Sequence, residues 1–281
     1  MRSGLLSAVP AYYLHHPARR RYPRRRVWVP EAYDQFNCDL VDLQRWKCYN
    51  LRFRYLLTCV DSFSKMAWVE PLRTKSSKVV AKAFERILRR CDRLPKHVAS
   101  DQGKEFIGKE FQQLLRSNGI KYFHTNSNLK NTQVERFNRS LMQRISRWMT
   151  SSKSKNYRPV LQDIVDGYNL SFHRAVGMTP VEAAEEKNKT KAFLNLYGPR
   201  KALELQGRIW KPKQLLNVGD TVLVASRKDP FRKSYEQSFK PERFKVIHVR
   251  KSQPPMYYLR NSQGRDIKGG FYHHEVLKLP H

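Results

Sequence analysis

Hydrophobic and polar positions fall into short regular blocks through the first half of the chain. Apolar blocks over Phe36–Leu43, Tyr55–Asp61 and Met66–Leu72 have the length and composition of strands. Residues Ser76–Cys91 then place apolar side chains at helical spacing, which predicts an amphipathic helix. Three strands followed by a helix indicate an α/β fold with a mixed sheet and flanking helices.

The same α/β pattern continues further along the chain, where Asn118 and Gly119 stop one helix and a polar loop over Asn126–Asn131 precedes another. The predicted elements are a strand over His97–Ser100, a helix over Lys109–Ser117, a strand over Ile120–Thr125, and helical segments over Thr132–Thr150, Arg158–His173 and Pro180–Lys187.

The last 65 residues have a different pattern. The turn sequence Asn217-Val218-Gly219-Asp220 opens a series of short apolar blocks over Thr221–Ala225, Arg243–Arg250 and Met256–Leu259. Short strands of this kind predict a small all-β barrel. The expected organisation is a basic N-terminal arm (1–34), an α/β core (35–188), a basic linker (189–216) and the barrel (217–281).

Charge indicates the class of partner. The chain has 55 lysines and arginines against 24 acidic residues, a net charge of +31. This excess is larger than solubility requires, and it favours a nucleic acid over a membrane surface. No acidic residue occurs before residue 31, and the arm carries a dense basic run made of Arg19, Arg20, Arg21, Arg24, Arg25 and Arg26. Such a run serves as a phosphate-binding tail, a nuclear localisation signal, part of a transit peptide or a solvated linker.

The sequence predicts neither a membrane-spanning segment nor a zinc site. No apolar run approaches the roughly 18 residues that cross a bilayer, so no membrane span is predicted. The four cysteines, Cys38, Cys48, Cys59 and Cys91, form no C-x-x-C pair and have no histidine at zinc-finger spacing. We therefore expect no zinc, and cysteines that are reduced and mostly buried.

Carboxylates at three places along the core suggest metal chemistry. Asp39 lies on the first strand, with Asp42 as its competitor, Asp101 follows a strand, and Glu135 lies in the long helix. Mg²⁺ prefers such hard oxygen ligands, and two ions about 3.5–4 Å apart activate an attacking oxygen and stabilise a leaving one. Taken singly, the residues also have structural explanations: Asp101 could cap a turn, and Glu135 could pair with Arg139.

The long helix separates an apolar face from a polar one. Its apolar stripe consists of Val134, Phe137, Leu141, Ile145 and Trp148. Glu135 and Arg139 fall on the opposite face, where a carboxylate can bind metal and a guanidinium can bind phosphate.

Taken together, these segments resemble the integrase catalytic core of retroviruses, retrotransposons and Maverick-like transposable elements. The resemblance covers residues 35–188 and rests on Asp39, Val60-Asp-Ser-Phe-Ser-Lys65, Asp101-Gln-Gly-Lys-Glu-Phe106, Val134-Glu-Arg-Phe-Asn-Arg139 and His173-Arg-Ala-Val-Gly-Met-Thr-Pro-Val-Glu182. The tail resembles the carboxy-terminal barrel of such integrases through Val218-Gly-Asp-Thr-Val222, Phe231-Arg-Lys-Ser-Tyr235, Glu242-Arg-Phe-Lys-Val246 and Gly270-Phe-Tyr-His-His-Glu275. The amino-terminal zinc domain usual in integrases has no counterpart here, where only His15-His16 occurs.

The resemblance implies an RNase H-like core that trims the 3′ ends of donor DNA and joins them to target DNA in the nucleus. Asp39, Asp101 and Glu135 would hold two Mg²⁺ or Mn²⁺ ions, and Asn138 and Arg139 would approach the DNA backbone. Family members act as multimers, which implies a homo-oligomer.

Two other functions fit the same residues. A catalytically silent descendant of an integrase would bind DNA through its basic arm and barrel without joining it. A nuclease that hydrolyses RNA in hybrids would use a similar acid-only site. The basic tail and the integrase-like segments favour joining over hydrolysis of RNA.

Overall fold

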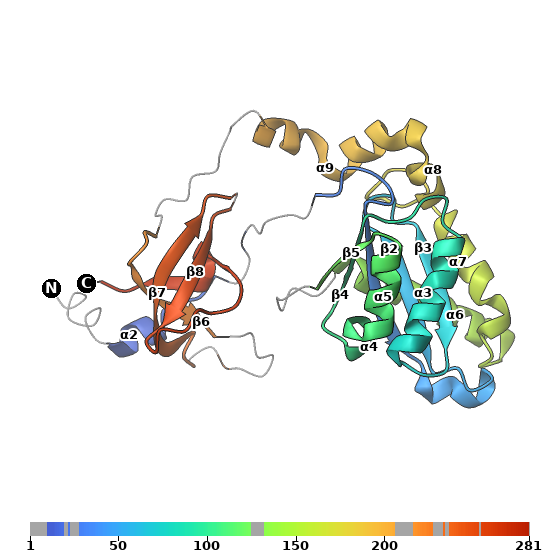
Figure 1. The fold of residues 1–281 in the computed structure, drawn as a ribbon, viewed down its shortest axis with the longest axis horizontal. Helices are drawn as coiled ribbons and strands as arrows, with labels where there is room; N and C mark the ends of the chain where they lie inside the picture. Colours follow the sequence, from blue (N-terminus) through green and yellow to red (C-terminus); the bar gives the residue numbers. More distant parts are fainter. Residues whose placement is uncertain are drawn as a thin grey trace. The chain divides into compact units, whose positions relative to one another are not determined.

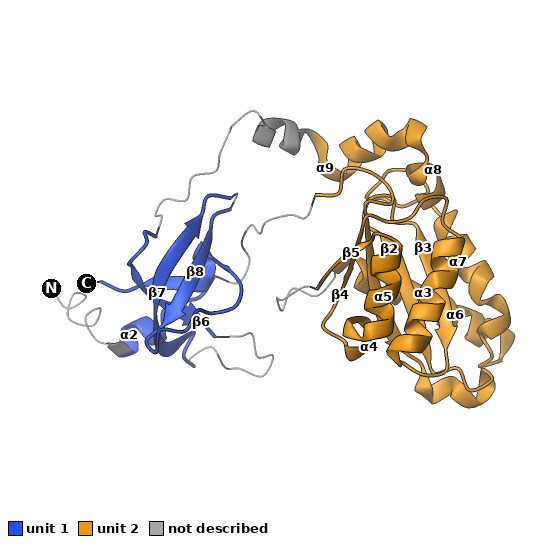
Figure 2. Cartoon of the chain, viewed as in Figure 1, with its two compact units in different colours: residues 1–27, 206–281 blue, residues 28–205 orange. Residues whose placement is uncertain are grey.

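The chain forms two compact units, which Figure 2 shows in separate colours: residues 28–205 make one, and residues 1–27 with 206–281 make the other. We call them the core unit and the C-terminal unit. The computed structural model describes residues 10–19, 22, 28–124, 132–205, 216–226, 233, 236–252 and 254–280, with the side chains of residue 10 and of residues 199–205 left out.

The core unit is built on a five-stranded mixed sheet in the order β3-β2-β1-β4-β5. The first three of these strands are antiparallel, whereas β4 runs parallel to β1 and to β5. The strands are β1 (Gln35–Asp42), β2 (Tyr55–Asp61), β3 (Ala67–Leu72), β4 (His97–Ser100) and β5 (Lys121–His124).

Helices cover both faces of this sheet, and Figure 1 shows α3, α4 and α5 in front of it. Neighbouring strand residues point to opposite faces, so Leu57 and Cys59 join the core with these three helices, whereas Leu56 and Val60 pack with α6 and α7. The helices are α3 (Ser77–Arg89), α4 (Lys104–Ile107), α5 (Lys109–Ser117), α6 (Thr132–Ser152), α7 (Leu161–Asn169), α8 (Pro180–Ala184) and α9 (Lys189–Leu205). Short 3₁₀ turns lie at η1 (Gln44–Tyr49), η2 (Arg158–Val160) and η3 (Glu186–Asn188).

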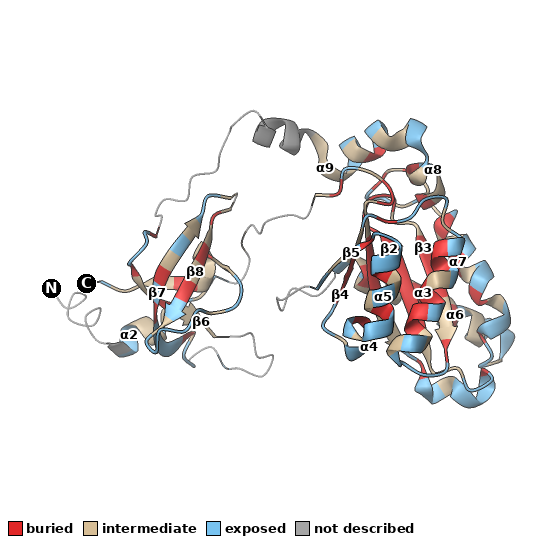
Figure 3. Ribbon diagram, viewed as in Figure 1, coloured by how far each residue is buried: buried red, intermediate tan, exposed pale blue. Residues whose placement is uncertain are grey.

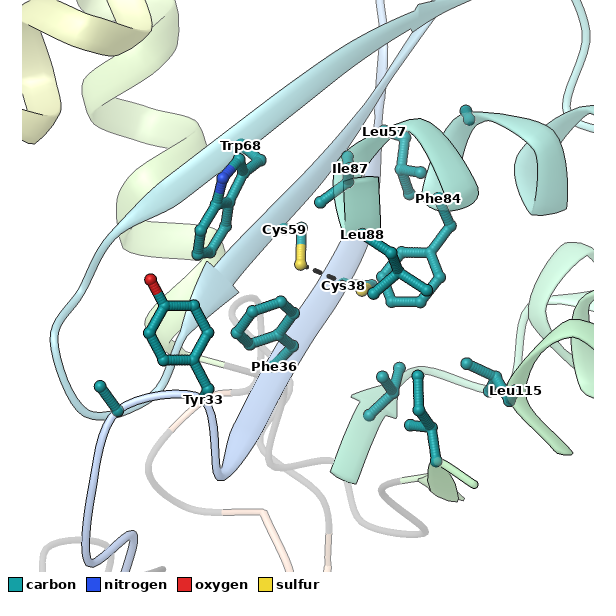
Figure 4. Packing of buried hydrophobic residues seen from close by; sticks show 14 of the residues in the cluster. Tyr33, Phe36, Cys38, Leu57, Cys59, Trp68, Phe84, Ile87, Leu88 and Leu115 are labelled. Atoms are coloured by element: carbon teal, nitrogen blue, oxygen red, sulfur yellow. Dashed lines mark hydrogen bonds between the residues drawn. The ribbon is translucent and has the colours of Figure 1, made fainter. Parts of the chain in front are cut away.

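The centre of the core unit is apolar and closely packed, as the buried strands and inner helix faces in Figure 3 show. Cys38 on β1 lies directly opposite Cys59 on β2, and their sulfur atoms are 3.7 Å apart (Figure 4). All four cysteines are free; Cys38 and Cys59 are buried, Cys91 is half-buried and Cys48 is exposed. The expected burial therefore holds for Cys38 and Cys59, in part for Cys91, and not for Cys48.

The predicted α/β core and the separate all-β unit are confirmed. The strands over 55–61, 97–100 and 221–225 and the helix over 109–117 match within their predicted limits. The elements that were not predicted include α2, η1 and α4 in the first half of the chain and β9, η4 and β10 at its end. Arg158–His173 is one 3₁₀ turn followed by α7, which ends at Asn169.

The borders of the core unit differ from the predicted limits at 35 and 188. Val29, Ala32 and Tyr33 are buried in the core, so the chain joins it before β1. At the other end, Ala192 of α9 is fully buried in the same cluster. Both extensions follow from burial of apolar side chains by distant parts of the chain, which a local pattern does not reveal.

The C-terminal unit contains a five-stranded antiparallel sheet in the order β10-β6-β7-β8-β9. Its apolar side includes Val222, Phe244, Tyr257 and Leu259, all buried. The N-terminal helix α2 packs on β7. The elements are α2 (Pro10–Leu14), β6 (Thr221–Ala225), β7 (Phe239–Arg250), β8 (Met256–Asn261), β9 (Phe271–Tyr272), η4 (His273–Glu275) and β10 (Val276–Lys278). Among the helices that the structure describes, none has the length and apolar character needed to cross a membrane.

The buried side chain of Asn169 joins α7 to the edge strand β3. Its amide nitrogen donates to the Ala67 carbonyl oxygen and its amide oxygen accepts from the Ala67 N–H, both at 2.9 Å. Asn169→Leu leaves both backbone groups buried without partners, so we expect the free energy of unfolding to fall by about 2–4 kcal/mol. Urea unfolding measures this, with the exposed-residue variant Gln113→Leu as control. A loss below about 1 kcal/mol would contradict the assignment.

Candidate active site

Asp39 lies on β1 in the middle of the sheet and faces α6. Its strand neighbours Cys38 and Leu40 pack into the opposite core, so alternation turns Asp39 toward the helix. Leu40 N–H donates to Asp39 Oδ1 and the Asn138 amide nitrogen donates to Oδ2, both at 2.8 Å. Burial, with the nearby carboxylates of Asp101 and Glu135 adding to it, raises the pKa of Asp39 to about 6. The ionised form of this half-buried carboxylate is therefore disfavoured by its surroundings.

Asp101 follows the last residue of β4 and sits beside β1. The parallel register pairs Phe36 with Val98 and Asn37 with Ala99, and continuing it by two residues brings Asp101 level with Asp39. The Asp101 side chain is exposed, and its Oδ1 accepts from the Gly103 N–H at 3.2 Å. The sheet thus brings together two carboxylates that are 62 residues apart in sequence.

Glu135 comes from the first turn of α6. The helix is fixed against the sheet by its buried stripe of Val134, Phe137, Leu141 and Ile145. This packing leaves Glu135 half-buried on a face where its charge acts on Asp39. The predicted apolar face is buried through these four residues, whereas Glu135, predicted with Arg139 on the opposite face, is half-buried, and of these two only Arg139 is exposed.

Asn138 and Arg139 have different surroundings. Asn138 is half-buried, and its amide nitrogen is held by Asp39, while its amide oxygen is buried with no hydrogen-bond partner. Arg139 is exposed. The structure therefore places Asn138 against the carboxylate and leaves Arg139 facing solvent.

The segment Val60-Asp61-Ser62-Phe63-Ser64-Lys65 supports the start of α6. The Lys65 ammonium donates to the Ser62 carbonyl oxygen and, at 3.1 Å, to Oε1 of Gln133, two residues before Glu135. Burial lowers the pKa of Lys65 to about 8. Asp61 at the end of β2 is fully buried and accepts from the N–H and hydroxyl of Ser64. These bonds tie the β2–β3 turn to the helix that carries Glu135.

Asp42, the other carboxylate considered on β1, is outside this group. It is exposed, and its two oxygens accept from the backbone and the side-chain nitrogen of Gln44 at 2.9 and 2.8 Å. These bonds lower the pKa of Asp42. Its role is to cap the turn after β1, which favours Asp39 as the site residue.

The three carboxylates are of the chemical type that binds a hard divalent cation. Asp39, Asp101 and Glu135 supply only oxygen atoms. The pKa of Asp39 is raised first by burial and further by the charges of Asp101 and Glu135, and a bound cation would stabilise this ionised carboxylate. As the side chains lie, no three His, Cys, Asp or Glu residues in the described part of the chain have the spacing of a metal site. Asp101 in particular is turned to its own loop through Gly103.

Of the arginines in the basic run that was predicted to bind DNA, only Arg19 lies among the described residues. Arg19 lies in the C-terminal unit and is exposed. The other arginines of the basic run lie outside the described residues: Arg20, Arg21, Arg24, Arg25 and Arg26.

Comparison with known proteins bears on the part of the chain that carries Asp39 and Asp101. Residues 31–128 match the family model described as the integrase core domain. This segment is therefore similar to the integrase core domain. The match spans all five strands of the core-unit sheet and ends before α6, so Glu135 lies beyond it.

Proteins similar to this chain occur in transposons and retroviruses. An uncharacterised transposon-derived protein of Caenorhabditis elegans is 31% identical over 200 residues, which is 71% of this chain and 65% of that protein. The Pol polyprotein of feline endogenous virus ECE1 is 33% identical over 153 residues, 50% of this chain and 14% of the polyprotein. The chain thus spans less than two thirds of either relative.

A solved structure shows the same fold outside the integrase core as well. The simian T-cell lymphotropic virus intasome, in complex with a PP2A regulatory subunit, contains a chain that matches with a TM-score of 0.69. The match covers 98% of this chain and 89% of that one, at 14% identity. At this identity the likeness concerns fold alone, and it includes the C-terminal unit.

Sequence reasoning missed two features of the site. Asn138 was expected on DNA, and its bond to Asp39 was not foreseen, although its position three residues after Glu135 places both on neighbouring parts of one helix face. The role of Lys65 was also missed. Lys65 lies in the segment 60–65 that resembles integrases, but its hydrogen bond to Gln133 depends on how the sheet and α6 pack.

Proposed function

We propose that this chain is a metal-dependent DNA integrase that trims the 3′ ends of donor DNA and joins them to target DNA. The observation that carries the proposal is the convergence of Asp39, Asp101 and Glu135. They come from a strand, the end of a neighbouring strand and a helix, and the charges of the last two act on the first. The match of residues 31–128 to the integrase core domain supports this use of the site.

Asp39, Asp101 and Glu135 would hold two Mg²⁺ or Mn²⁺ ions. Bound there, the ions would activate the attacking oxygen, water in trimming and a 3′-hydroxyl in joining, and would stabilise the leaving oxygen. Asp101 would turn from the Gly103 N–H toward the ions, a side-chain rotation that its exposure permits. No covalent bond between enzyme and DNA is needed.

Asn138 acts as a positioning residue in this scheme. Its amide nitrogen holds Oδ2 of Asp39, which fixes the carboxylate relative to α6. Arg139 is exposed one turn after Glu135, and in this proposal it would contact a phosphate of the DNA backbone.

The net charge of +31 supports DNA as the partner, with donor ends and target both bound mainly through phosphates. Such binding is steeply salt-dependent and shows little base preference. The nucleus is the compartment where this activity would be used, and a homo-oligomer would hold two donor ends at once.

The decisive experiment is joining of a labelled DNA end to a target plasmid with Mg²⁺, with Mn²⁺ and with EDTA. We expect products only with metal, and none above background for Asp101→Asn. Asp42→Asn is the matched control, because it removes a carboxylate from β1 that caps a turn outside the site. Its product yield should stay within about twofold of the original chain, a change below 0.5 kcal/mol.

Other outcomes identify the alternatives. DNA binding without any product under all three conditions would indicate a silent descendant of an integrase. Metal-dependent cleavage of the RNA strand in a hybrid, without joining of DNA, would indicate a nuclease. Joining that survives in Asp101→Asn would contradict the proposed site.

A further inference from the structure

Lys65 occupies a backbone position that is unfavourable for a lysine. It lies in the turn between β2 and β3, where the Asp61 N–H donates to the Met66 carbonyl oxygen at 2.8 Å and the Lys65 N–H donates to the Asp61 carbonyl oxygen at 3.1 Å. The φ angle of Lys65 is 70°, in the left-handed region where glycine is preferred and a side chain is strained. The conformation of the turn therefore does not explain a lysine here.

The surroundings of the Lys65 ammonium are unfavourable as well. Burial lowers its pKa to about 8; the charge of Asp61 opposes this shift, and the charge of Arg136 adds to it. The ammonium also lies at the first turn of α6, where the positive end of the helix dipole disfavours a cation. Backbone and electrostatics thus both disfavour a lysine, and the hydrogen bonds that the ammonium donates offset them.

Those hydrogen bonds connect strand β1 to helix α6. Ser62 is fixed to β1, because its N–H donates to the Gln35 carbonyl oxygen at 2.8 Å and its hydroxyl accepts from the Asn37 side chain at 2.5 Å. The Lys65 ammonium donates to the Ser62 carbonyl oxygen and, at 3.1 Å, to Oε1 of Gln133 in the first turn of α6. One ammonium group thereby links the strand that carries the first site aspartate to the helix that carries the site glutamate.

This link and the bond of Asn138 to Asp39 lie on either side of Glu135 along α6. Gln133 precedes Glu135 by two residues, and Asn138 follows it by three. The first N–H groups of a helix have no partner within it, so its first turn opens more readily than the rest. Packing of Val134 holds this turn on the sheet but is non-directional, whereas the two hydrogen bonds fix how the turn is rotated.

We propose that Lys65 is a positioning residue, which fixes the first turn of α6 and so holds the Glu135 carboxylate toward Asp39. The inference rests on the proposed function for the metal that Glu135 would bind. Its structural part, the fixed turn, needs neither metal nor DNA. Lys65 acts through Gln133, two residues before the carboxylate.

The structural part is tested by amide hydrogen exchange of the full chain in EDTA. In a regular helix the N–H groups of Arg136 and Phe137 donate to the carbonyl oxygens four residues earlier, so their exchange reports opening of the first turn. Lys65→Met keeps the aliphatic stem and the same backbone conformation but donates no hydrogen bond. We expect exchange at these two amides to be about fivefold faster, the change that corresponds to loss of one hydrogen bond. Lys78→Met, on the exposed surface of α3 at the opposite face of the sheet, should exchange as the original chain does.

Lys65→Gly separates the role of the ammonium from that of the backbone. Glycine suits a φ of 70°, so this variant removes the ammonium and relieves the strain of the turn together. We expect exchange at the first turn of α6 to be as fast as in Lys65→Met. Such a result could not be ascribed to a strained turn, and this variant carries the test if Lys65→Met does not fold.

The functional part is tested by thermal unfolding over a series of Mg²⁺ or Mn²⁺ concentrations. We expect the concentration that gives half of the rise in midpoint to increase about tenfold in Lys65→Met, the lower end of the range for groups that orient metal ligands. In a Glu135→Gln background the same substitution should change this concentration by less than about twofold, because the carboxylate that Lys65 positions is gone. A lysine with a purely structural role would lower the metal-free midpoint and leave this concentration unchanged.

Three outcomes decide between the inference and its alternatives. Unchanged exchange at Arg136 and Phe137 in both Lys65 variants overturns the inference. An equal effect of Lys65→Met on the metal concentration with and without the Glu135 carboxylate overturns it too. An original chain that shows no response to metal would overturn the proposed function, and the exchange result would then still decide whether Lys65 fixes the first turn.

Discussion

Asp39→Asn is expected to abolish DNA joining and, at the same time, to make the metal-free protein more stable at pH 7.5. Joining should fall at least about 100-fold, because the variant loses an anionic ligand worth several kcal/mol in a two-metal reaction. Stability should rise because the original carboxylate is ionised in a half-buried site beside Asp101 and Glu135. The gain should be about 1–3 kcal/mol, since a pKa of about 6 in place of 3.8 sets the upper end and partial exposure lowers it.

The pH dependence fixes the sign of this effect. The folded-state pKa of Asp39 is raised, so the folded protein binds this proton more tightly than the unfolded chain does. The contribution of Asp39 to stability is therefore lost as pH rises from about 4 to about 6. Urea unfolding in EDTA should show the advantage of Asp39→Asn at pH 7.5 and its disappearance near pH 4.

Asp42→Asn is the control for this measurement, because the pKa of Asp42 is lowered, whereas that of Asp39 is raised. Removing that carboxylate should reduce stability at pH 7.5 and should leave joining intact. If Asp39→Asn is less stable than the original chain at pH 7.5, the carboxylate is not under electrostatic strain and the proposed site loses its main physical support.

Mg²⁺ or Mn²⁺ is expected to stabilise the folded chain in the absence of DNA. A ligand that binds only the folded state at 100 times its dissociation constant adds about 2.7 kcal/mol. Thermal unfolding over a series of metal concentrations should therefore show a rising midpoint that EDTA reverses. The physical cause is that a cation stabilises the ionised, half-buried carboxylate of Asp39 and offsets the charges of Asp101 and Glu135 that act on it.

Glu135→Gln tests whether the helix takes part in holding the metal. The substitution keeps the size of the side chain and its place in the first turn of α6, so the fold should be unaffected. We expect the metal-induced rise in the midpoint to shrink markedly in this variant. Glu110→Gln, on the exposed surface of α5, should respond to metal as the original chain does. An equal response of Glu135→Gln would leave only the two aspartates as ligands.

Much of the local structure could be predicted from sequence because its cause is local. The apolar stripe of α6 follows helical spacing, and the same stripe is buried in the structure. Strand β2 was predicted to the residue because it is a mainly apolar block, interrupted only by Thr58 before its last residue, that the sheet buries on both faces. The α4 turn escaped prediction because four residues are too few to show a period.

The candidate site was only partly predictable. The carboxylate types and their order along the chain indicated metal chemistry, and the integrase resemblance favoured Asp39 over Asp42. The hydrogen bonds of the two carboxylates add the physical difference between them. Gln44 binds Asp42, whereas α6 meets Asp39 through Asn138. Such pairings depend on which side chains of distant elements meet, and no local pattern records them.

The sequence by itself determined the α/β and all-β elements, the excess of positive charge and the set of acidic residues, because spacing, composition and residue chemistry are properties of the chain. Tertiary structure alone decided that the parallel pairing of β1 with β4 sets Asp101 beside Asp39, and that packing of α6 brings the charge of Glu135 to act on Asp39. It also decided that Tyr22 lies against Glu275, 253 residues away. The physical reason is the same in each case: burial of apolar surface far along the chain, not local preference, selects which polar groups become neighbours.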